Sequence, residues 1–234
     1  LRGTGGVSLA DPQAYMEGQW AMKAKLRESP VTAEGLPMYG TEVLVNVINE
    51  HGALPTRNHQ ETVFDEAENI SGETLTETRL VANKACFSCT IACGRVSTLP
   101  GEAASKYSVT TNPQNWKIAG EGPEYEAAWA MGSECGIGDL DALIKANWLC
   151  NDLGMDSISF GASVAAAMEL FEKGTVTQNE TEIPLQFGSA EALIAMAEKT
   201  AYRQGFGDAL AEGSKRMTEK LGRPEFFMGV RGQE

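Results

Sequence analysis

The sequence has no apolar run near the roughly 20 residues that a membrane-spanning helix needs, and it does not begin with the basic-then-apolar order of a secretory leader. Positive charge is also scarce, because 19 Lys and Arg stand against 32 Asp and Glu, for a net charge of −13. Nucleic-acid phosphates are bound by surfaces of the opposite sign. We therefore expect a soluble, cytoplasmic protein with no nucleic-acid partner and no membrane partner.

Histidine is almost absent, since the chain has two, His51 and His59. They lie eight residues apart on either side of Pro55, which matches no compact spacing of metal ligands, and we predict that both are surface or structural residues. Five cysteines, three of them tightly clustered, do not suit a set of disulfides. We expect a reducing compartment and a thiolate ligand set.

Apolar residues make up 42% of the 234 residues, which is enough to bury a core. Their spacing, with glycine stops and polar N-caps, is typical of a mainly α fold. The face of the first helix that carries Tyr15, Met22 and Leu26 is expected to pack in the core. The predicted helices cover residues 11–29, 41–52, 73–84, 124–134, 139–154, 159–174, 189–205 and 208–222. Residues 94–122, with β-formers such as Val109 and Thr110, predict a loop or weak hairpin.

Cys86, Cys89 and Cys93 form a C-x2-C-x3-C trio. An iron–sulfur cluster commonly takes three thiolates from one short turn and a fourth from a remote part of the chain. Structural zinc sites favour two separated C-x2-C pairs, which the sequence lacks. An iron–sulfur cluster is therefore the preferred interpretation, and a zinc site or unligated thiols are the alternatives. Cys135 and Cys150 have apolar neighbours and are predicted to be core residues.

These residues resemble a known family, the tungsten-containing aldehyde:ferredoxin oxidoreductases, specifically their central helical domain. Five stretches that follow the family's order carry the resemblance, namely Leu54-Pro55-Thr56-Arg57-Asn58, Cys86-Phe87-Ser88-Cys89-Thr90-Ile91-Ala92-Cys93-Gly94-Arg95, Gly122-Pro123-Glu124-Tyr125-Glu126, the run from Asn147 to Ser159, and Gly205-Phe206-Gly207-Asp208.

The resemblance implies an irregular helical domain at residues 11–234, with residues 1–10 as the tail of a preceding cofactor-binding domain and a C-terminal helical domain to follow. It implies a tungsten, or molybdenum, bis-pterin cofactor and a [4Fe-4S] cluster. Cys86, Cys89 and Cys93 would be three cluster ligands, and the fourth would come from the C-terminal helical domain.

The family's D-x-x-G-L-(C/D) motif, which holds the pterin, is matched here by Asn151 to Asp156. Gly154 and Asp156 keep the pattern, whereas Asn151 and Met155 depart from it, so Asn151 would offer a neutral acceptor in place of a carboxylate. Read from the residues alone, Gly154 is a helix C-cap and Asp156 a turn residue. Glu126, in preference to Glu124, resembles the glutamate that the family places near the metal. A desolvated carboxylate there can exchange a proton.

The function implied is oxidation of aldehydes to carboxylic acids, with electrons passing through the cluster to ferredoxin or another electron-transfer protein. We expect this fragment to be inactive alone, and a homo-oligomer is compatible with the sequence. Two alternatives stay open: an iron–sulfur electron-transfer module without pterin chemistry, and a zinc-stabilised helical interaction domain.

Overall fold

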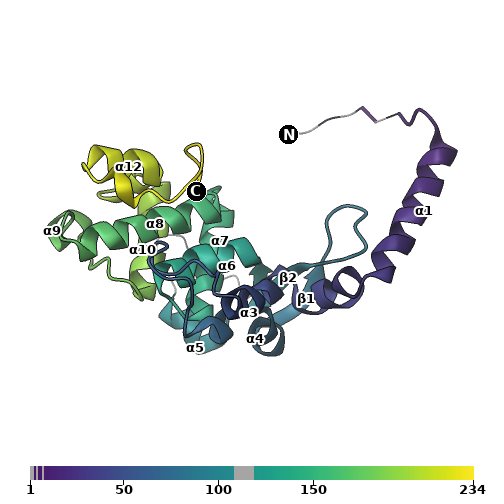
Figure 1. The fold of residues 1–234 in the computed structure, drawn as a ribbon, viewed down its shortest axis with the longest axis horizontal. Helices are drawn as coiled ribbons and strands as arrows, with labels where there is room; N and C mark the ends of the chain where they lie inside the picture. Colours follow the sequence, from purple (N-terminus) through teal and green to yellow (C-terminus); the bar gives the residue numbers. More distant parts are fainter. Residues whose placement is uncertain (1–2, 4, 7, 108–118) are drawn as a thin grey trace.

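The computed structural model describes residues 3, 5–6, 8–107 and 119–234. It is mainly helical, as the sequence predicts, and it also has a small sheet at one side (Figure 1). The elements are α1 Pro12–Glu28, α2 Leu36–Tyr39, α3 Leu44–Glu50, α4 Gly72–Thr78, β1 Leu80–Lys84, β2 Gly94–Thr98, α5 Gly101–Lys106, β3 Ala119–Glu121, α6 Tyr125–Met131, α7 Leu140–Leu153, α8 Ser157–Glu172, α9 Gln178–Thr181, α10 Ala190–Ala201, α11 Gly207–Leu210 and α12 Ser214–Lys220.

The core lies among α6, α7, α8 and α10, which we call the helical body. Leu143, Met168 and Leu193 are fully buried there. Helices α6 and α8 cross closely at Gly161, where an added Cβ would lie 2.6 Å from the backbone of Ala130. A polar side chain caps the N-terminus of α7, α8 and α10 by accepting a backbone N–H, as a cap should, and these caps are Asp139, Asp156 and Ser189. The body is thus held by apolar burial between capped helices.

The sheet is antiparallel, in the order β1-β2-β3. Lys84 pairs with Gly94 at the loop end of the β1–β2 hairpin, and Gly94 has no room for a side chain because its Cβ would meet the Lys84 carbonyl oxygen at 2.8 Å. Residues 85–93 connect the two strands, and we call them the cysteine loop. The loop extends from the sheet on the side where α1 projects (Figure 1). The three clustered cysteines therefore lie at the tip of a hairpin.

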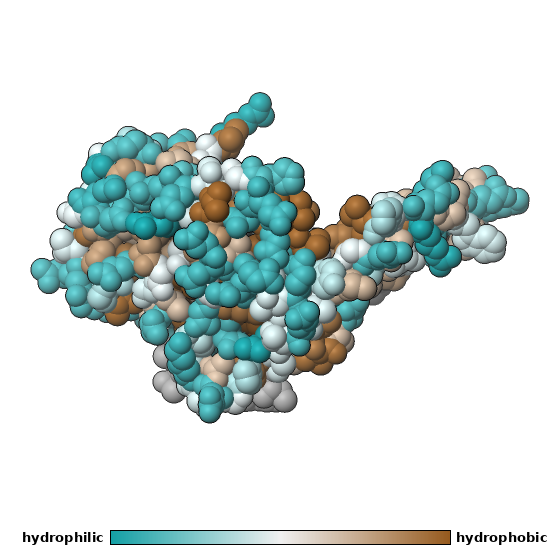
Figure 2. Space-filling view, turned by 60° about the horizontal axis from the view of Figure 1, so that its bottom comes forward, coloured by the Kyte–Doolittle hydropathy of each residue, from teal (hydrophilic) through white to brown (hydrophobic). Residues whose placement is uncertain are grey.

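Helix α1 projects from the molecule and has no buried residue (Figure 1). Its cap is as predicted, because Asp11 accepts the Ala14 N–H at 3.0 Å. The expected core packing of its apolar face is wrong for this structure: Tyr15 and Met22 are 47% and 50% exposed. Figure 2 shows hydrophobic residues exposed near the place where the projecting segment joins the body.

Three predicted helices need correction. Residues 73–84 are helical to Thr78 only, and Leu80–Lys84 form β1, because pairing with β2 overrides a helical pattern. The predicted helix 208–222 is broken at Gly213, whose φ of 84° lies in the left-handed region, so α11 and α12 are separate. Helix α8 begins at Ser157, two residues before the predicted Ser159, because Asp156 is its cap.

The weak hairpin expected after the cysteine cluster corresponds to β2 and β3, which pair antiparallel, with the unpredicted α5 between them. Val109 and Thr110 lie outside the described residues. Among the described residues, no helix is both long and apolar enough to cross a membrane.

Candidate functional site

The cysteine loop bends tightly around its thiols. The Cys89 N–H donates to the Cys86 carbonyl at 3.0 Å, and Ser88 and Ala92 adopt φ values of 60° and 54°. Non-glycine residues in this left-handed region are uncommon, and they persist where surrounding contacts hold them. Cys86 is exposed, while Cys89 and Cys93 are partly buried. The loop thus gathers three free thiols on one short, sharply turned segment.

Its surroundings perturb the thiol of Cys93. Burial raises the pKa of the Cys93 thiol, and the negative charges of Glu124, Cys89 and Cys86 raise it further. The donor set suits an iron–sulfur cluster, whose ligands are thiolates. Within the part of the chain that the structure describes, however, no three His, Cys, Asp or Glu side chains are gathered closely enough to hold a metal ion. Chemistry and location fit a cluster site, and the thiols would have to draw together on binding.

A cavity of about 560 Å³ lies between β3, α6, α7 and the start of α8. Its lining includes three carboxylates from consecutive turns of the chain, Glu121, Glu124 and Glu126. The Gly122 N–H donates to the Arg95 carbonyl at 2.8 Å, so the cavity wall contacts the chain two residues beyond Cys93. An acidic cavity and the thiol loop are therefore neighbours.

Glu124 is the partly buried carboxylate of this cavity. Burial raises the pKa of Glu124, and the Thr41 hydroxyl, which donates to its Oε2 at 2.5 Å, opposes that rise. Thr41 also accepts the Tyr125 N–H at 2.9 Å. The predicted helix 41–52 begins instead with a 3-10 turn, Thr41–Val43, and the Thr41 side chain holds the start of α6.

Glu126, predicted to be catalytic, lines the same cavity and is exposed rather than desolvated. Its Oε2 accepts the indole N–H of Trp129 at 2.6 Å, one turn further along α6. That hydrogen bond fixes the carboxylate at the cavity wall. The desolvation expected of Glu126 is found at Glu124 instead.

Glycines allow the β3 segment to approach α7. A Cβ at Gly120 would lie 2.6 Å from Trp148 Nε1, and one at Gly122 would lie 2.2 Å from Asn147 Nδ2. Asn147 and Asn151 both donate to the Glu121 carbonyl, at 2.9 and 3.2 Å. Asn151, predicted to bind the pterin, therefore lines the acidic cavity with its Oδ1 still an acceptor.

Trp148 was not anticipated from the sequence. Trp148 is 4% exposed and lines the acidic cavity, while its buried Nε1, which lies against Gly120, has no hydrogen-bond partner among the described residues. Buried donors are nearly always satisfied, so this donor is an exception. A single tryptophan in an apolar helix gives no sequence signal of this property.

Gly154 and Asp156 do not line the acidic cavity. Gly154, with φ 73°, is the C-cap of α7, and the Asp156 carboxylate accepts the Ser159 N–H at 2.8 Å as the cap of α8. Both border a separate cavity of about 370 Å³ on the α10 side. The structure thus brings Glu126 and Asn151 to one cavity and divides the predicted pterin set between two.

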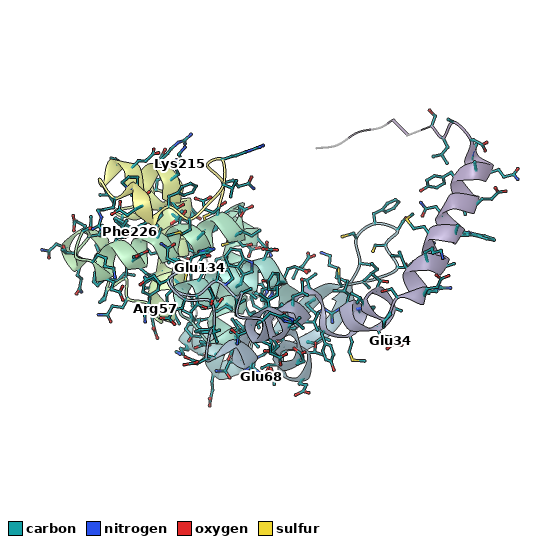
Figure 3. The ribbon with its side chains drawn as sticks, viewed as in Figure 1. Glu34, Arg57, Glu68, Glu134, Lys215 and Phe226 are labelled. Carbon is teal, nitrogen blue, oxygen red and sulfur yellow. The ribbon has the colours of Figure 1, made fainter. Side chains whose placement is uncertain are left out.

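The two histidines are exposed, as predicted. His59 Nδ1 lies 2.9 Å from Oε1 of Glu134, a fully buried carboxylate inside the helical body (Figure 3). The contact is an ion pair without hydrogen-bond alignment, since both Glu134 oxygens are unpartnered. It raises the pKa of His59, while burial raises the pKa of Glu134. This pair, with Trp129, borders a third cavity of about 450 Å³.

Cys135 and Cys150 are fully buried, which confirms that they are core residues. Burial raises the pKa of the Cys150 thiol to about 12 and that of Cys135 well above its ordinary value. Neither thiol is a candidate ligand in this structure.

The sequence of the chain is similar to those of known proteins. The family model described as aldehyde ferredoxin oxidoreductase, domains 2 & 3, matches residues 18–234. The chain is 46% identical to the tungsten-containing aldehyde ferredoxin oxidoreductase of Pyrococcus horikoshii and 44% identical to that of Pyrococcus furiosus. Each alignment covers 100% of the chain, but 37% and 36% of the relative, so the chain spans little more than a third of these proteins.

Two further matches are more distant. An aliphatic sulfonate oxidoreductase, WOR-like subunit, of Pyrococcus furiosus is 26% identical and aligns with 75% of the chain and 26% of its own length. A solved structure, the active site complex BamBC of benzoyl coenzyme A reductase in complex with 1,5 dienoyl-CoA, superposes with a TM-score of 0.68 at 19% identity, over 100% of this chain and 35% of that one. That structural likeness concerns the fold alone.

Proposed function

This chain belongs to the aldehyde ferredoxin oxidoreductase family, and on that premise we propose that it is part of a tungsten–pterin oxidoreductase that oxidises aldehydes to carboxylic acids. We propose further that a [4Fe-4S] cluster at the cysteine loop passes the electrons to ferredoxin. One observation supports the proposal: Glu124 lines the acidic cavity, and its charge also acts on the Cys93 thiol of the cysteine loop.

In this proposal residues 11–234 form a central helical domain whose side chains serve two neighbouring groups. Cys86, Cys89 and Cys93 would hold the cluster, and Asn151, Gly154 and Asp156 would hold the pterin. A tungsten–pterin group, when bound, would supply the two-electron oxidation. Gly154 and Asp156 lie in the turn between α7 and α8 and border a different cavity from Asn151. Their contact with the pterin would therefore be made by this turn and not from the wall of the acidic cavity.

Glu126 would manage the protons. Conversion of an aldehyde and water to a carboxylic acid releases two electrons and two protons, and a carboxylate at the cavity wall can accept a proton from the attacking water. The Trp129 N–H that donates to Glu126 at 2.6 Å holds this acceptor in place. Glu124, whose pKa is raised by burial, is the second proton-exchanging group of the cavity.

The cluster assignment is tested on the full-length protein by metal and sulfide analysis with electron paramagnetic resonance. We expect iron, labile sulfide and tungsten in the wild type, and loss of the cluster signal in C86S, C89S and C93S. T90A, in the same loop, is the matched control and should keep the signal. Zinc without iron or labile sulfide in the wild type would contradict the proposal.

The catalytic assignment is tested by steady-state oxidation of aldehydes with a dye or ferredoxin as acceptor. E126Q should lower kcat by about 100-fold or more while tungsten and iron contents stay at the wild-type level. E102Q, on the exposed helix α5, is the control for removal of a carboxylate. Wild-type kcat in E126Q would remove Glu126 from the mechanism.

A further inference from the structure

Arg95 is the largest fully buried side chain of the described residues, with 1% of its surface exposed. Its Nε donates to the carbonyl of Cys93 at 3.1 Å, and its Nη2 donates to that of Ala92 at 3.1 Å. Nη2 also donates to the carbonyl of Pro37 at 3.0 Å, and Nη1 donates to that of Met38 at 2.9 Å, both in α2. Arg95 thus connects the end of the cysteine loop to a helix more than fifty residues earlier.

The guanidinium occupies a tight site. A Cβ at Gly40, just beyond α2, would lie 3.0 Å from both Arg95 Nε and the Cys93 carbonyl oxygen. The planar fork of arginine can donate to several carbonyls at once, which a lysine ammonium cannot match in geometry. The arrangement holds Ala92 in its left-handed conformation and fixes the backbone that carries the Cys93 thiol.

The charge of Arg95 has no contact ion pair among the described residues, since its hydrogen bonds all go to backbone carbonyls. Buried charges are normally paired. The carboxylates that act on it from further away are Glu124 and Glu42. Burial raises the pKa of Glu42 well above its ordinary value. A buried cation therefore lies directly behind the third thiol with no carboxylate in hydrogen-bond contact among the described residues.

We propose that Arg95 is a positioning residue for the iron–sulfur site, which clamps the Cys93 backbone through its guanidinium and raises the reduction potential of the cluster through its fixed positive charge. The inference rests on the proposed function, because it requires a cluster at the cysteine loop. Iron–sulfur clusters with thiolate ligands are anionic, and a cation in a weakly polar interior favours the form that holds one more electron. That electron comes from the aldehyde and leaves to the external acceptor, with two such transfers for each aldehyde oxidised.

The test uses the full-length holoenzyme and separates the clamp from the charge. R95K keeps a positive charge and loses the fork, while R95Q and R95M lose the charge. R79K, at the start of the same hairpin but paired with Asp141 and not with the loop, is the control. Each variant is titrated potentiometrically with the cluster followed by electron paramagnetic resonance, and iron loss to a chelator is timed.

We expect R95Q and R95M to show a midpoint potential more negative than that of the wild type. R95K should keep a potential near the wild-type value but retain iron about 10-fold less well, because the clamp is lost. R79K should change neither quantity. An unchanged potential in folded R95Q or R95M overturns the electrostatic part of the proposal, and unchanged iron retention in R95K overturns the clamp.

If R95Q and R95M fail to fold, R95K still decides, together with hydrogen exchange of the Ala92 and Cys93 amides. Faster exchange in R95K than in the wild type supports the clamp, and equal exchange contradicts it. Failure of the proposed function looks different, because the wild type would then show no iron–sulfur signal. A normal wild-type signal with unaffected Arg95 variants removes this inference alone.

Discussion

In the helical body, α6, α7, α8 and α10 bury apolar side chains from end to end, whereas in the hairpin that carries the cysteine loop the first strand is exposed along most of its length. Ten residues of α7 are buried, namely Leu140 and residues 142–150, whereas β1 has no buried residue. The hairpin is held instead by polar contacts such as those of Arg95, and of Arg79 with Asp141.

The helical body and the hairpin are therefore stabilised by different interactions, apolar burial in the first and polar contacts in the second. Burial of apolar surface contributes several kcal/mol at a single large side chain, whereas a polar contact contributes about 1 kcal/mol but specifies a geometry. We therefore expect substitutions in the body to change the free energy of unfolding, and substitutions in the hairpin to change mainly the local order of the site.

The largest effect is expected in the body. L143A removes a fully buried side chain between α7 and α6, and we predict that it lowers the free energy of unfolding by about 3 kcal/mol. V81A, at a 57% exposed position of β1, is the matched deletion in the hairpin and should cost less than about 0.5 kcal/mol. Denaturant titration of the chain followed by circular dichroism measures both. Equal losses would show that the two regions do not differ in this way.

An intermediate effect is expected where the hairpin meets the body. Arg79, directly before β1, donates Nε to Asp141 Oδ1 at 2.6 Å and Nη2 to Oδ2 at 3.1 Å, in the first turn of α7. Both side chains are about one-fifth exposed, so R79M should cost about 1 kcal/mol of global stability.

Hydrogen exchange locates the consequence of R79M. Amides of β1 and β2 should exchange faster, and those of α7 and α8 should not. K25M is the control, because Lys25 and Glu28 form an ion pair that is exposed on both sides and should contribute nothing measurable. Uniformly faster exchange across the body would mean that the hairpin is not a separate unit of stability.

The same difference explains what the sequence could predict. Helices with glycine stops and side-chain caps are local features, so α7 and α10 and the caps Asp139 and Ser189 could be read from the pattern. Residues 80–84 could not, because their strand depends on pairing with residues that follow the cysteine loop. The break at Gly213 was missed because the apolar spacing continues across it.

Some residues of the candidate site could likewise be predicted from the sequence, and others could not. The cysteine spacing identified the thiol loop, and the motif residues Glu126 and Asn151 do reach one cavity. Trp148 and Arg95 were not predicted, because their importance comes from what surrounds them: an orphaned donor in one case and a set of distant carbonyls in the other. No pattern within a single segment indicates either property.

The smallest effect is a pH dependence confined to the body. The contact with Glu134 raises the pKa of His59 above that of an unfolded histidine, near 6.5, and burial raises the pKa of Glu134. A raised folded-state pKa contributes stability below the unfolded pKa, and that stability is lost as the pH rises through the folded value. Both groups act in this direction, and the nearby charge of Glu234 also raises the pKa of Glu134.

We therefore predict that the denaturation midpoint of the chain falls as the pH rises from about 6.5 towards 8, and that H59Q flattens this fall. H51Q, the other exposed histidine, is the control and should keep the wild-type slope. The change is expected to be small, because His59 is 42% exposed and solvent screens its charge. If H59Q keeps the full slope, the dependence does not come from His59, and the buried carboxyl of Glu134, whose pKa is also raised, is then its source.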